Sequence, residues 1–193
     1  MQIDICVDQP KVLSDYGDIP IAFEVRQFLD VAPVKGKTEF LLKERPVKIR
    51  FVKDYDAIPG AHPSEWSAQF EVSAWGFLSA QVAGKCIGRA AIATKTPSLE
   101  ILGSSDDVAL LWDIRVAPEL RANGVGSALF CAAKAWAERR GCRELKVETQ
   151  NINVAACRFY EKQGCKLVTV KSRVYDDLPD ELQLIWSTDL GVR

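Results

Sequence analysis

The stretch LLWDIRVAPELRANGVGSALF, residues 110–130, begins as an apolar run, passes through a proline and two glycines, and ends as an alanine-rich segment with helical spacing. An apolar strand that leads through such a turn into a helix leaves the backbone N–H groups of the first helical turn unpaired. Those groups and the positive end of the helix favour an anion, most often a phosphate. No G-K-[ST] follows, and Leu129 stands in place of the third glycine of a dinucleotide fingerprint, so the turn predicts a phosphate site of another kind.

The segments on both sides of this turn predict regular structure. Apolar residues recur at helical spacing after it, at Val125, Leu129, Ala132, Ala133 and Trp136. They indicate a helix over residues 124–140 that ends at Gly141. A buried strand is expected before the turn at 108–116, and another strand after the helix at 144–149.

The last fifty residues predict a second helix and two closing strands. The helix is expected over 153–163, with Asn153 as its N-cap and Gly164 directly after its end. The closing strands are expected at 165–175 and 181–190.

The first half of the chain predicts strands and loops. Ala83 and Gly84 separate two strand-like runs, which indicates a hairpin. Strands are expected at 19–29, 37–44, 72–82 and 85–94, with loops and a short helical turn over 53–69 and a loop over 95–107. This order predicts a mixed sheet in an α/β or α+β domain rather than an alternating doubly wound sheet.

Composition is typical of a globular protein without nucleic-acid partners. The 193 residues are 48% hydrophobic and 26% charged, with a formal net charge of −1. The run 41–53 carries five basic residues and is interpreted as a solvated face, with nucleic-acid binding as the alternative. No window approaches the roughly 18 apolar residues of a membrane span, and no signal peptide follows Met1, so we expect a cytoplasmic protein with no membrane partner.

The cysteines and histidine predict no metal site. Six cysteines occur at scattered spacings without a CxxC pair, and His62 is the single histidine. Reduced, mostly buried thiols are therefore expected.

The sequence resembles the GNAT superfamily of N-acyltransferases over residues 108–171. The resemblance rests on the stretch quoted above and on ELKVETQNINVAACRFYEKQGC, residues 144–165, which contains N-x-x-A-x-x-[FL]-Y-E-K-x-G. Within the superfamily the second stretch, with Val174 and Tyr175, is most similar to streptothricin acetyltransferases. The resemblance implies a mostly antiparallel central sheet flanked by helices, with a splayed strand pair at the cofactor site. It implies a single domain, with residues 1–70 as a variable acceptor-side half and 71–193 as an acetyl-CoA-binding core.

By this resemblance the co-substrate is acetyl-CoA and no metal is required. The backbone amides of the turn would hold the pyrophosphate, which assigns Arg121, Ala122, Asn123, Gly124, Val125 and Gly126. The pantetheine arm would pair with the main chain of Ile114, Arg115 and Val116. Asn153 would also bind this arm, although its role as an N-cap is an alternative that can coexist.

The catalytic candidates are Tyr160, Asp113 and Glu148. By resemblance Tyr160 lies beside the CoA sulfur, where a phenol can protonate the leaving thiolate, and core packing is its alternative role. Asp113 and Glu148 are candidates for accepting the amine proton, and a structural carboxylate is an equal alternative for each. Cys157 has no histidine to activate it, which favours direct transfer over a covalent intermediate.

The resemblance implies transfer of acetyl to a primary amine of a small molecule, with a streptothricin-type antibiotic as the leading acceptor. The alternatives are a metabolite or protein amine, and a catalytically silent CoA-binding regulatory module; a homodimer is compatible with each. The acidic residues Asp176, Asp177, Asp180 and Glu181 either attract a cationic amine or form a solubilising hairpin. Trp66 and Trp75 occur where family members place acceptor-site segments.

Overall fold

The structure is a computed structural model that describes residues 2–103, 105–175, 178 and 180–191. The chain forms two compact units. The first unit comprises residues 1–22, 54–145 and 189–193, and the second unit comprises residues 23–53 and 146–188.

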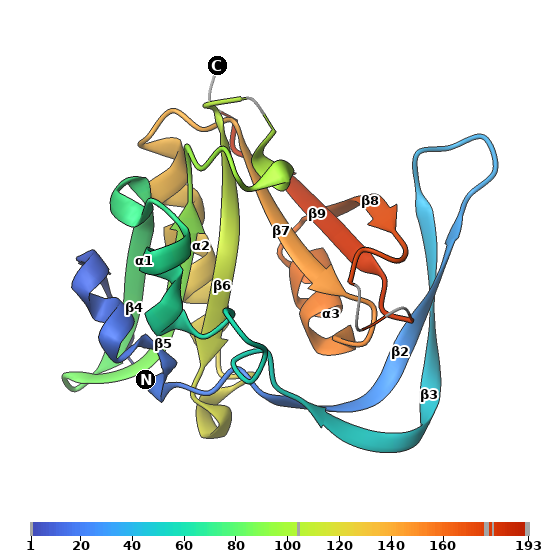
Figure 1. The fold of residues 1–193 in the computed structure, drawn as a ribbon, viewed down its shortest axis with the longest axis horizontal. Helices are drawn as coiled ribbons and strands as arrows, with labels where there is room; N and C mark the ends of the chain where they lie inside the picture. Colours follow the sequence, from blue (N-terminus) through green and yellow to red (C-terminus); the bar gives the residue numbers. More distant parts are fainter. Residues whose placement is uncertain (1, 104, 176–177, 179, 192–193) are drawn as a thin grey trace. The chain divides into compact units, whose positions relative to one another are not determined.

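An antiparallel sheet forms the centre of the first unit. Its strands lie in the order β1 (Asp4–Asp8), β4 (Gly76–Val82), β5 (Lys85–Ala93) and β6 (Val108–Val116). Helix α2 (Val125–Glu138) packs against β4, β5 and β6 on one face. Figure 1 shows α1 (Trp66–Gln69) and neighbouring short helical segments over the opposite face. These segments are η1 (Pro10–Ser14), η2 (Tyr16–Asp18), η3 (Pro63–Glu65) and η4 (Val72–Ala74); η5 (Glu100–Leu102) and η6 (Pro118–Leu120) flank β6 in the chain.

Large aromatic residues fill the core on the face covered by the short helical segments. Trp66 and Trp75 are only 3% and 4% exposed, and their ring centroids lie 6.3 Å apart. Tyr16 is fully buried 5.3 Å from Trp66. Trp66 and Trp75 therefore pack in the interior of the first unit and do not form a surface of an acceptor loop.

The hairpin predicted around residues 83–84 is confirmed. Ala83 and Gly84 both have positive φ, 50° and 78°, and they join β4 to β5. Positive φ at both central residues is the backbone of the tight hairpin turn whose twist matches the flanking strands.

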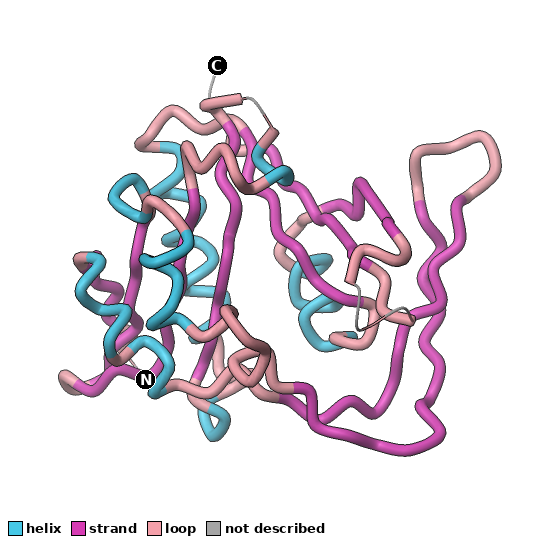
Figure 2. The backbone as a smooth tube through the Cα atoms, viewed as in Figure 1, coloured by secondary structure: helices cyan, strands magenta, loops and turns pink. Residues whose placement is uncertain are grey.

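The second unit contains a long two-stranded ribbon and a small sheet. The antiparallel ribbon of β2 (Phe23–Pro33) and β3 (Phe40–Lys53) is the pair of long strands in Figure 2. The sheet has the order β7, β9, β8, and α3 (Val154–Lys162) packs against β8 and β2. The strands run over Glu144–Gln150 (β7), Lys166–Lys171 (β8) and Gln183–Asp189 (β9), and the first two residues of β7 belong to the first unit.

The predicted fold class is confirmed, because the strands form mostly antiparallel sheets flanked by helices. The splay between strands and the single-domain organisation stay predictions. The expected strand at 37–44 is too short, because β3 continues through Pro46 to Lys53. Pro46 lies where the register of β3 against β2 shifts, between Val25 and Gln27, and such irregular positions tolerate proline. Strand β1 and the short helical segments over residues 10–18 were not predicted.

The basic run lies along β3, where Lys43, Arg45, Lys48 and Arg50 are exposed. The exposure of these four residues agrees with the interpretation of a solvated face, whereas Lys53, the fifth basic residue of the run, is buried and pairs with Glu181. In the part of the chain that the structure describes, each helix is too short or too polar to span a lipid bilayer.

Candidate active site

The predicted phosphate turn connects β6 to α2 in the first unit. Its backbone enters the left-handed region at Ala122, with φ of 63°, and again at Gly124, with φ of 87°. The first hydrogen bond of α2 runs from the N–H of Ala128 to the carbonyl of Gly124 at 3.0 Å. The N–H groups of Val125 and Gly126 precede it and have no acceptor within the helix. A Cβ built on Gly124 would meet no non-neighbouring atom of the described chain within 4 Å, so the turn faces open space.

The side chain of Arg121 holds this turn in place. Its guanidinium donates to the carbonyl oxygens of Val116 and Ala22, both at 3.1 Å, and of Pro20 at 2.9 Å. The amide of Asn123 donates to the carbonyl of Arg121 at 3.0 Å. Burial lowers the pKa of Arg121. The Arg121 side chain thus has a structural role, which leaves the main chain of the turn for a ligand.

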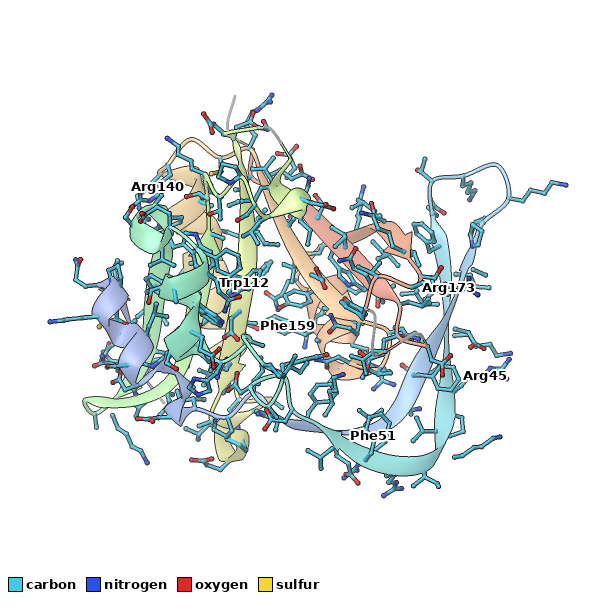
Figure 3. All side chains as sticks on the ribbon, in the orientation of Figure 1. Arg45, Phe51, Trp112, Arg140, Phe159 and Arg173 are labelled. Carbon is cyan, nitrogen blue, oxygen red and sulfur yellow. The ribbon has the colours of Figure 1, made fainter. Side chains whose placement is uncertain are left out.

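Strand β6 carries a bulge just before the residues assigned to pantetheine. The register pairs Asp113 with Ala91 and Leu111 with Ile92, so Trp112, labelled in Figure 3, is the extra residue. Bulges of this kind are frequent next to active sites because they redirect the following side chains. Ile114 is half-buried after the bulge. Val116 is also half-buried, whereas Arg115 between them is buried.

Asp113 takes part in a buried network with Arg115. The hydroxyl of Tyr16 donates to Oδ1 of Asp113 at 3.0 Å, and Nη2 of Arg115 donates to Oδ2 at 2.7 Å. Nη1 of Arg115 also donates to Asp56 at 2.8 Å. Asp113 is therefore held in an ion pair with the guanidinium of Arg115, which favours its structural role over that of a base.

The charges in this network are fixed by their surroundings. Burial raises the pKa of Tyr16 well above its ordinary value, and the charge of Asp113 raises it further. Burial lowers the pKa of Arg115, but the carboxylates of Asp113 and Asp56 outweigh it and raise the pKa overall. Tyr16 thus stays protonated and Arg115 stays charged at neutral pH. The sequence did not point to Tyr16 or Asp56, because they lie 97 and 59 residues from their partners.

Glu148 lies on β7 in the second unit and accepts several hydrogen bonds. Tyr175 donates its hydroxyl to Oε1 of Glu148, and Gln183 donates to Oε2 at 3.0 Å. Gln150 donates to Oε1 at 3.2 Å. Burial raises the pKa of Glu148, and the hydrogen bonds from Tyr175, Gln183 and Gln150 offset part of this rise. A carboxylate with a raised pKa is a stronger proton acceptor when ionised, which suits a general base.

Helix α3 carries the other candidates of the second unit. Tyr160 is 4% exposed, with its ring centroid 5.1 Å from that of Phe159. Asn153 caps the helix, because its Oδ1 accepts from the N–H of Ala156 at 3.1 Å. Burial raises the pKa of Cys157 to about 11, and its sulfur lies 3.4 Å from the hydroxyl of Thr149. Cys157 is therefore a neutral thiol at physiological pH.

The predicted site residues are divided between the two units. Asp113 to Val116 and the turn 121–126 belong to the first unit, and Glu148, Asn153 and Tyr160 belong to the second. Asp176 and Asp177 lie outside the described residues, whereas Asp180 and Glu181 line a groove of the second unit. Among the described residues, no group of three or more His, Cys, Asp or Glu side chains could hold a metal ion.

Comparison with known proteins identifies relatives of this chain. The chain is 35% identical over 103 residues to streptothricin acetyltransferase A of Bacillus subtilis (strain 168), a match that covers 52% of this chain and 54% of that protein. It is 32% identical over 91 residues to the streptothricin acetyltransferase of Escherichia coli, covering 46% of this chain and 52% of that protein. The chain thus spans about half the length of these two curated relatives.

Solved structures show the same fold. A Bacillus anthracis (strain Ames) protein, provisionally named a streptothricin acetyltransferase and solved in complex with acetyl coenzyme A, has a TM-score of 0.78 to this chain. The two are 24% identical, and the match covers 97% of this chain and 99% of that one. The model of the acetyltransferase (GNAT) family matches residues 47–165, more than half of the sequence. This chain belongs to the acetyltransferase (GNAT) family.

Proposed function

We propose that this protein is an acetyl-CoA-dependent N-acetyltransferase that transfers an acetyl group directly to a primary amine, with a streptothricin-type antibiotic as the acceptor. The observation that carries the proposal is the turn at residues 121–126, where a left-handed Gly124 opens α2 beside open space. The names of the Bacillus subtilis and Escherichia coli relatives support the choice of acceptor.

The residues of the turn fit the pyrophosphate of acetyl-CoA. Free N–H groups at the start of α2 and the positive end of its dipole suit a doubly charged group, and glycine allows its close approach. The main chain of Ile114 and Val116 and the side chain of Asn153 are the proposed contacts of the pantetheine arm. Asn153 can serve both as N-cap and as ligand contact, because its Nδ2 donates nothing to the cap. Acetyl-CoA supplies the acetyl group as an activated thioester.

Glu148 is the proposed acceptor of the amine proton. An alkyl amine with pKa near 10.4 is neutral in only about 0.04% of molecules at pH 7, so a positioned base is needed. The hydrogen bonds from Tyr175, Gln183 and Gln150 fix the orientation of the Glu148 carboxylate. Asp113 is paired with the charged guanidinium of Arg115, whereas Glu148 accepts hydrogen bonds from the neutral side chains of Tyr175, Gln183 and Gln150 and has a pKa raised by burial. We therefore assign the base to Glu148 rather than to Asp113.

Tyr160 is the proposed acid. Proton transfer from a phenol, ordinarily of pKa near 10, to a thiolate whose thiol has a pKa near 8.5 is uphill by about 1.5 pK units, so the phenol must lie beside the sulfur while the C–S bond breaks. The Tyr160 side chain is buried on α3, which restricts the positions that its ring can take. Cys157 is a poor nucleophile because its thiol stays protonated at neutral pH. Direct transfer is therefore favoured over an acetyl-cysteine intermediate.

A thiol-release assay tests the proposal. Purified protein is incubated with acetyl-CoA and a panel that contains streptothricin, an aminoglycoside, a metabolite amine and a peptide with a free N-terminus. Thiol release that depends on both protein and streptothricin is the expected result. Thiol release with another amine but not with streptothricin would contradict streptothricin as the acceptor and would still support the acetyltransferase activity. Acetyl-CoA binding without release for any amine would favour a regulatory module.

A further inference from the structure

The second unit contains a groove whose described lining includes none of the residues proposed to bind acetyl-CoA or to act as acid or base. The groove has a volume of about 760 Å³, and the β2–β3 ribbon and the segments next to β7 and β9 line it. This volume is in the range of pockets that hold drug-sized ligands. Figure 3 labels Phe51, one of its wall residues, on β3. The apolar wall among the described residues includes Phe28, Val31, Val47, Phe51, Leu178 and Leu182.

Asn151 fixes the base of this groove. Its carbonyl accepts from the N–H of Leu29 at 2.9 Å, and its Nδ2 donates back to the carbonyl of Leu29 at 3.3 Å. Its Oδ1 accepts from the N–H of Leu182 at 2.9 Å, and its own N–H donates to the carbonyl of Leu182 at 3.2 Å. Asn151 thus joins β2 to the segment before β9 with four hydrogen bonds. These hydrogen bonds hold Leu29 and Leu182, two residues of the groove lining, next to Asn151.

Glu181 places a buried, incompletely satisfied carboxylate in the groove. Its residue is 7% exposed, and its Oε1 accepts from Nζ of Lys53 at 2.7 Å. Its Oε2 is buried and has no hydrogen-bond partner among the described residues. A buried acceptor without a donor is unfavourable, so an N–H donor from a ligand would be stabilising there.

The described lining of the groove is acidic as well as apolar. Asp180 and Asp30 line it with Glu181, and no lysine or arginine lies among its described lining residues. Lys53 compensates the charge of Glu181, and Arg45 pairs with Asp30 at 2.8 Å in an exposed ion pair. Asp180 is exposed, so its charge is screened but accessible to a ligand.

We infer that this groove binds an amine acceptor that carries at least two ammonium groups on an alkyl chain, with one ammonium at Oε2 of Glu181 and near Asp180. This inference rests on the proposed function, because it names the substrate class of the same enzyme. The alkyl chain would lie against Phe51 and its apolar neighbours. The ammonium held here is not the amine that is acetylated, since transfer requires a neutral nitrogen. The groove thus selects diamines over monoamines.

Calorimetry without acetyl-CoA tests the inference independently of catalysis. Streptothricin is titrated into the wild-type protein and into Asp180→Asn, Glu181→Gln and Phe51→Ser. We expect Asp180→Asn to weaken binding about 2- to 5-fold, as for a partly exposed charge pair. Glu181→Gln should weaken it about 10-fold or more, because a buried charge contact is lost. Glu24→Gln is the matched control, since Glu24 lies on β2 outside the groove and should bind streptothricin like the wild type.

The outcomes separate this inference from the proposed function. Equal streptothricin affinity in the wild type, Asp180→Asn and Phe51→Ser would show that the groove does not bind the acceptor, even if thiol release with streptothricin continued. Weaker binding in these variants without thiol release would support the groove and contradict the proposed function. Asp180 and Phe51 are both exposed, so these two variants keep the test decisive if Glu181→Gln fails to fold because the buried ion pair with Lys53 is lost.

Discussion

Glu148 gives the reaction its expected pH dependence. It can accept a proton only when ionised, and burial raises its pKa above the ordinary value of a glutamate. As the pH falls through this raised pKa, Glu148 becomes protonated and kcat/KM should fall. The acidic limb should therefore begin at a higher pH than for an unperturbed glutamate. Glu148→Gln should lower the rate and abolish this limb, which a pH profile of thiol release measures.

Tyr175 gives a second test of the same assignment. Its hydroxyl donates to Glu148 and lowers the pKa of that carboxyl. Tyr175→Phe removes this hydrogen bond, so the pKa of Glu148 should rise and the acidic limb should move to higher pH. If the acidic limb of the pH profile stays at the same pH in Tyr175→Phe, a group other than Glu148 controls it.

Tyr160 is expected to act on the chemical step alone. Tyr160→Phe should lower kcat by about 10²- to 10⁴-fold, the usual contribution of general acid catalysis. Affinity for acetyl-CoA should stay within a few fold, because only the proton donated in the transition state is lost. Steady-state kinetics together with calorimetry separate the two effects. Full activity over the whole pH range would assign Tyr160 to core packing.

Among the secondary-structure elements, the turn before α2 carries the proposed pyrophosphate site. Gly124→Val should weaken acetyl-CoA binding, because a side chain would enter the space next to the unpaired N–H groups. It should also cost about 1–2 kcal/mol of folding stability, because φ at this position is 87°.

Gly84 provides the matched control for this substitution. It also has a positive φ, 78°, with no non-neighbouring atom of the described chain within 4 Å of a Cβ. Gly84→Val should therefore lower the melting temperature to a similar extent and leave acetyl-CoA affinity unchanged. Equal acetyl-CoA affinity in Gly124→Val and Gly84→Val would contradict the proposal that the turn binds the pyrophosphate.

Gly76 of β4 lies in close contact with Trp136 of α2. A Cβ at Gly76 would lie 2.4 Å from Cε2 of Trp136, which is itself only 4% exposed. Because the indole cannot move without disturbing the helix packing, Gly76→Ala should cost about 1–3 kcal/mol of stability. Chemical denaturation measures this loss. A variant as stable as the wild type would show that Trp136 has room to shift.

At the scale of the whole molecule, local patterns predicted the elements well and the distant contacts poorly. The strand at 108–116, the glycine turn and the capped helix after Asn153 each depend on residues close in sequence, and the structure contains them. The partners of Asp113 and Glu148 could not be predicted in this way. Tyr16 is 97 residues from Asp113, and Tyr175 is 27 residues from Glu148.

The second unit shows why strand lengths were also missed. Strand β3 alternates exposed charged residues with half-buried ones over only part of its length, and Pro46 interrupts the pattern. Its pairing with β2 across the ribbon, from Phe23 opposite Lys53 to Pro33 opposite Phe40, extends the strand beyond what periodicity indicates. Tertiary pairing of this kind outweighs local propensity in strands.

We propose that this GNAT-family protein transfers an acetyl group from acetyl-CoA to an amine. Mass spectrometry of streptothricin after incubation with the protein and acetyl-CoA tests it most directly. We expect a product that carries one added acetyl group, formed with the wild type and at a greatly reduced rate with Tyr160→Phe. Streptothricin recovered unchanged, with no acetylated product from any amine of the panel although acetyl-CoA binds, would contradict it.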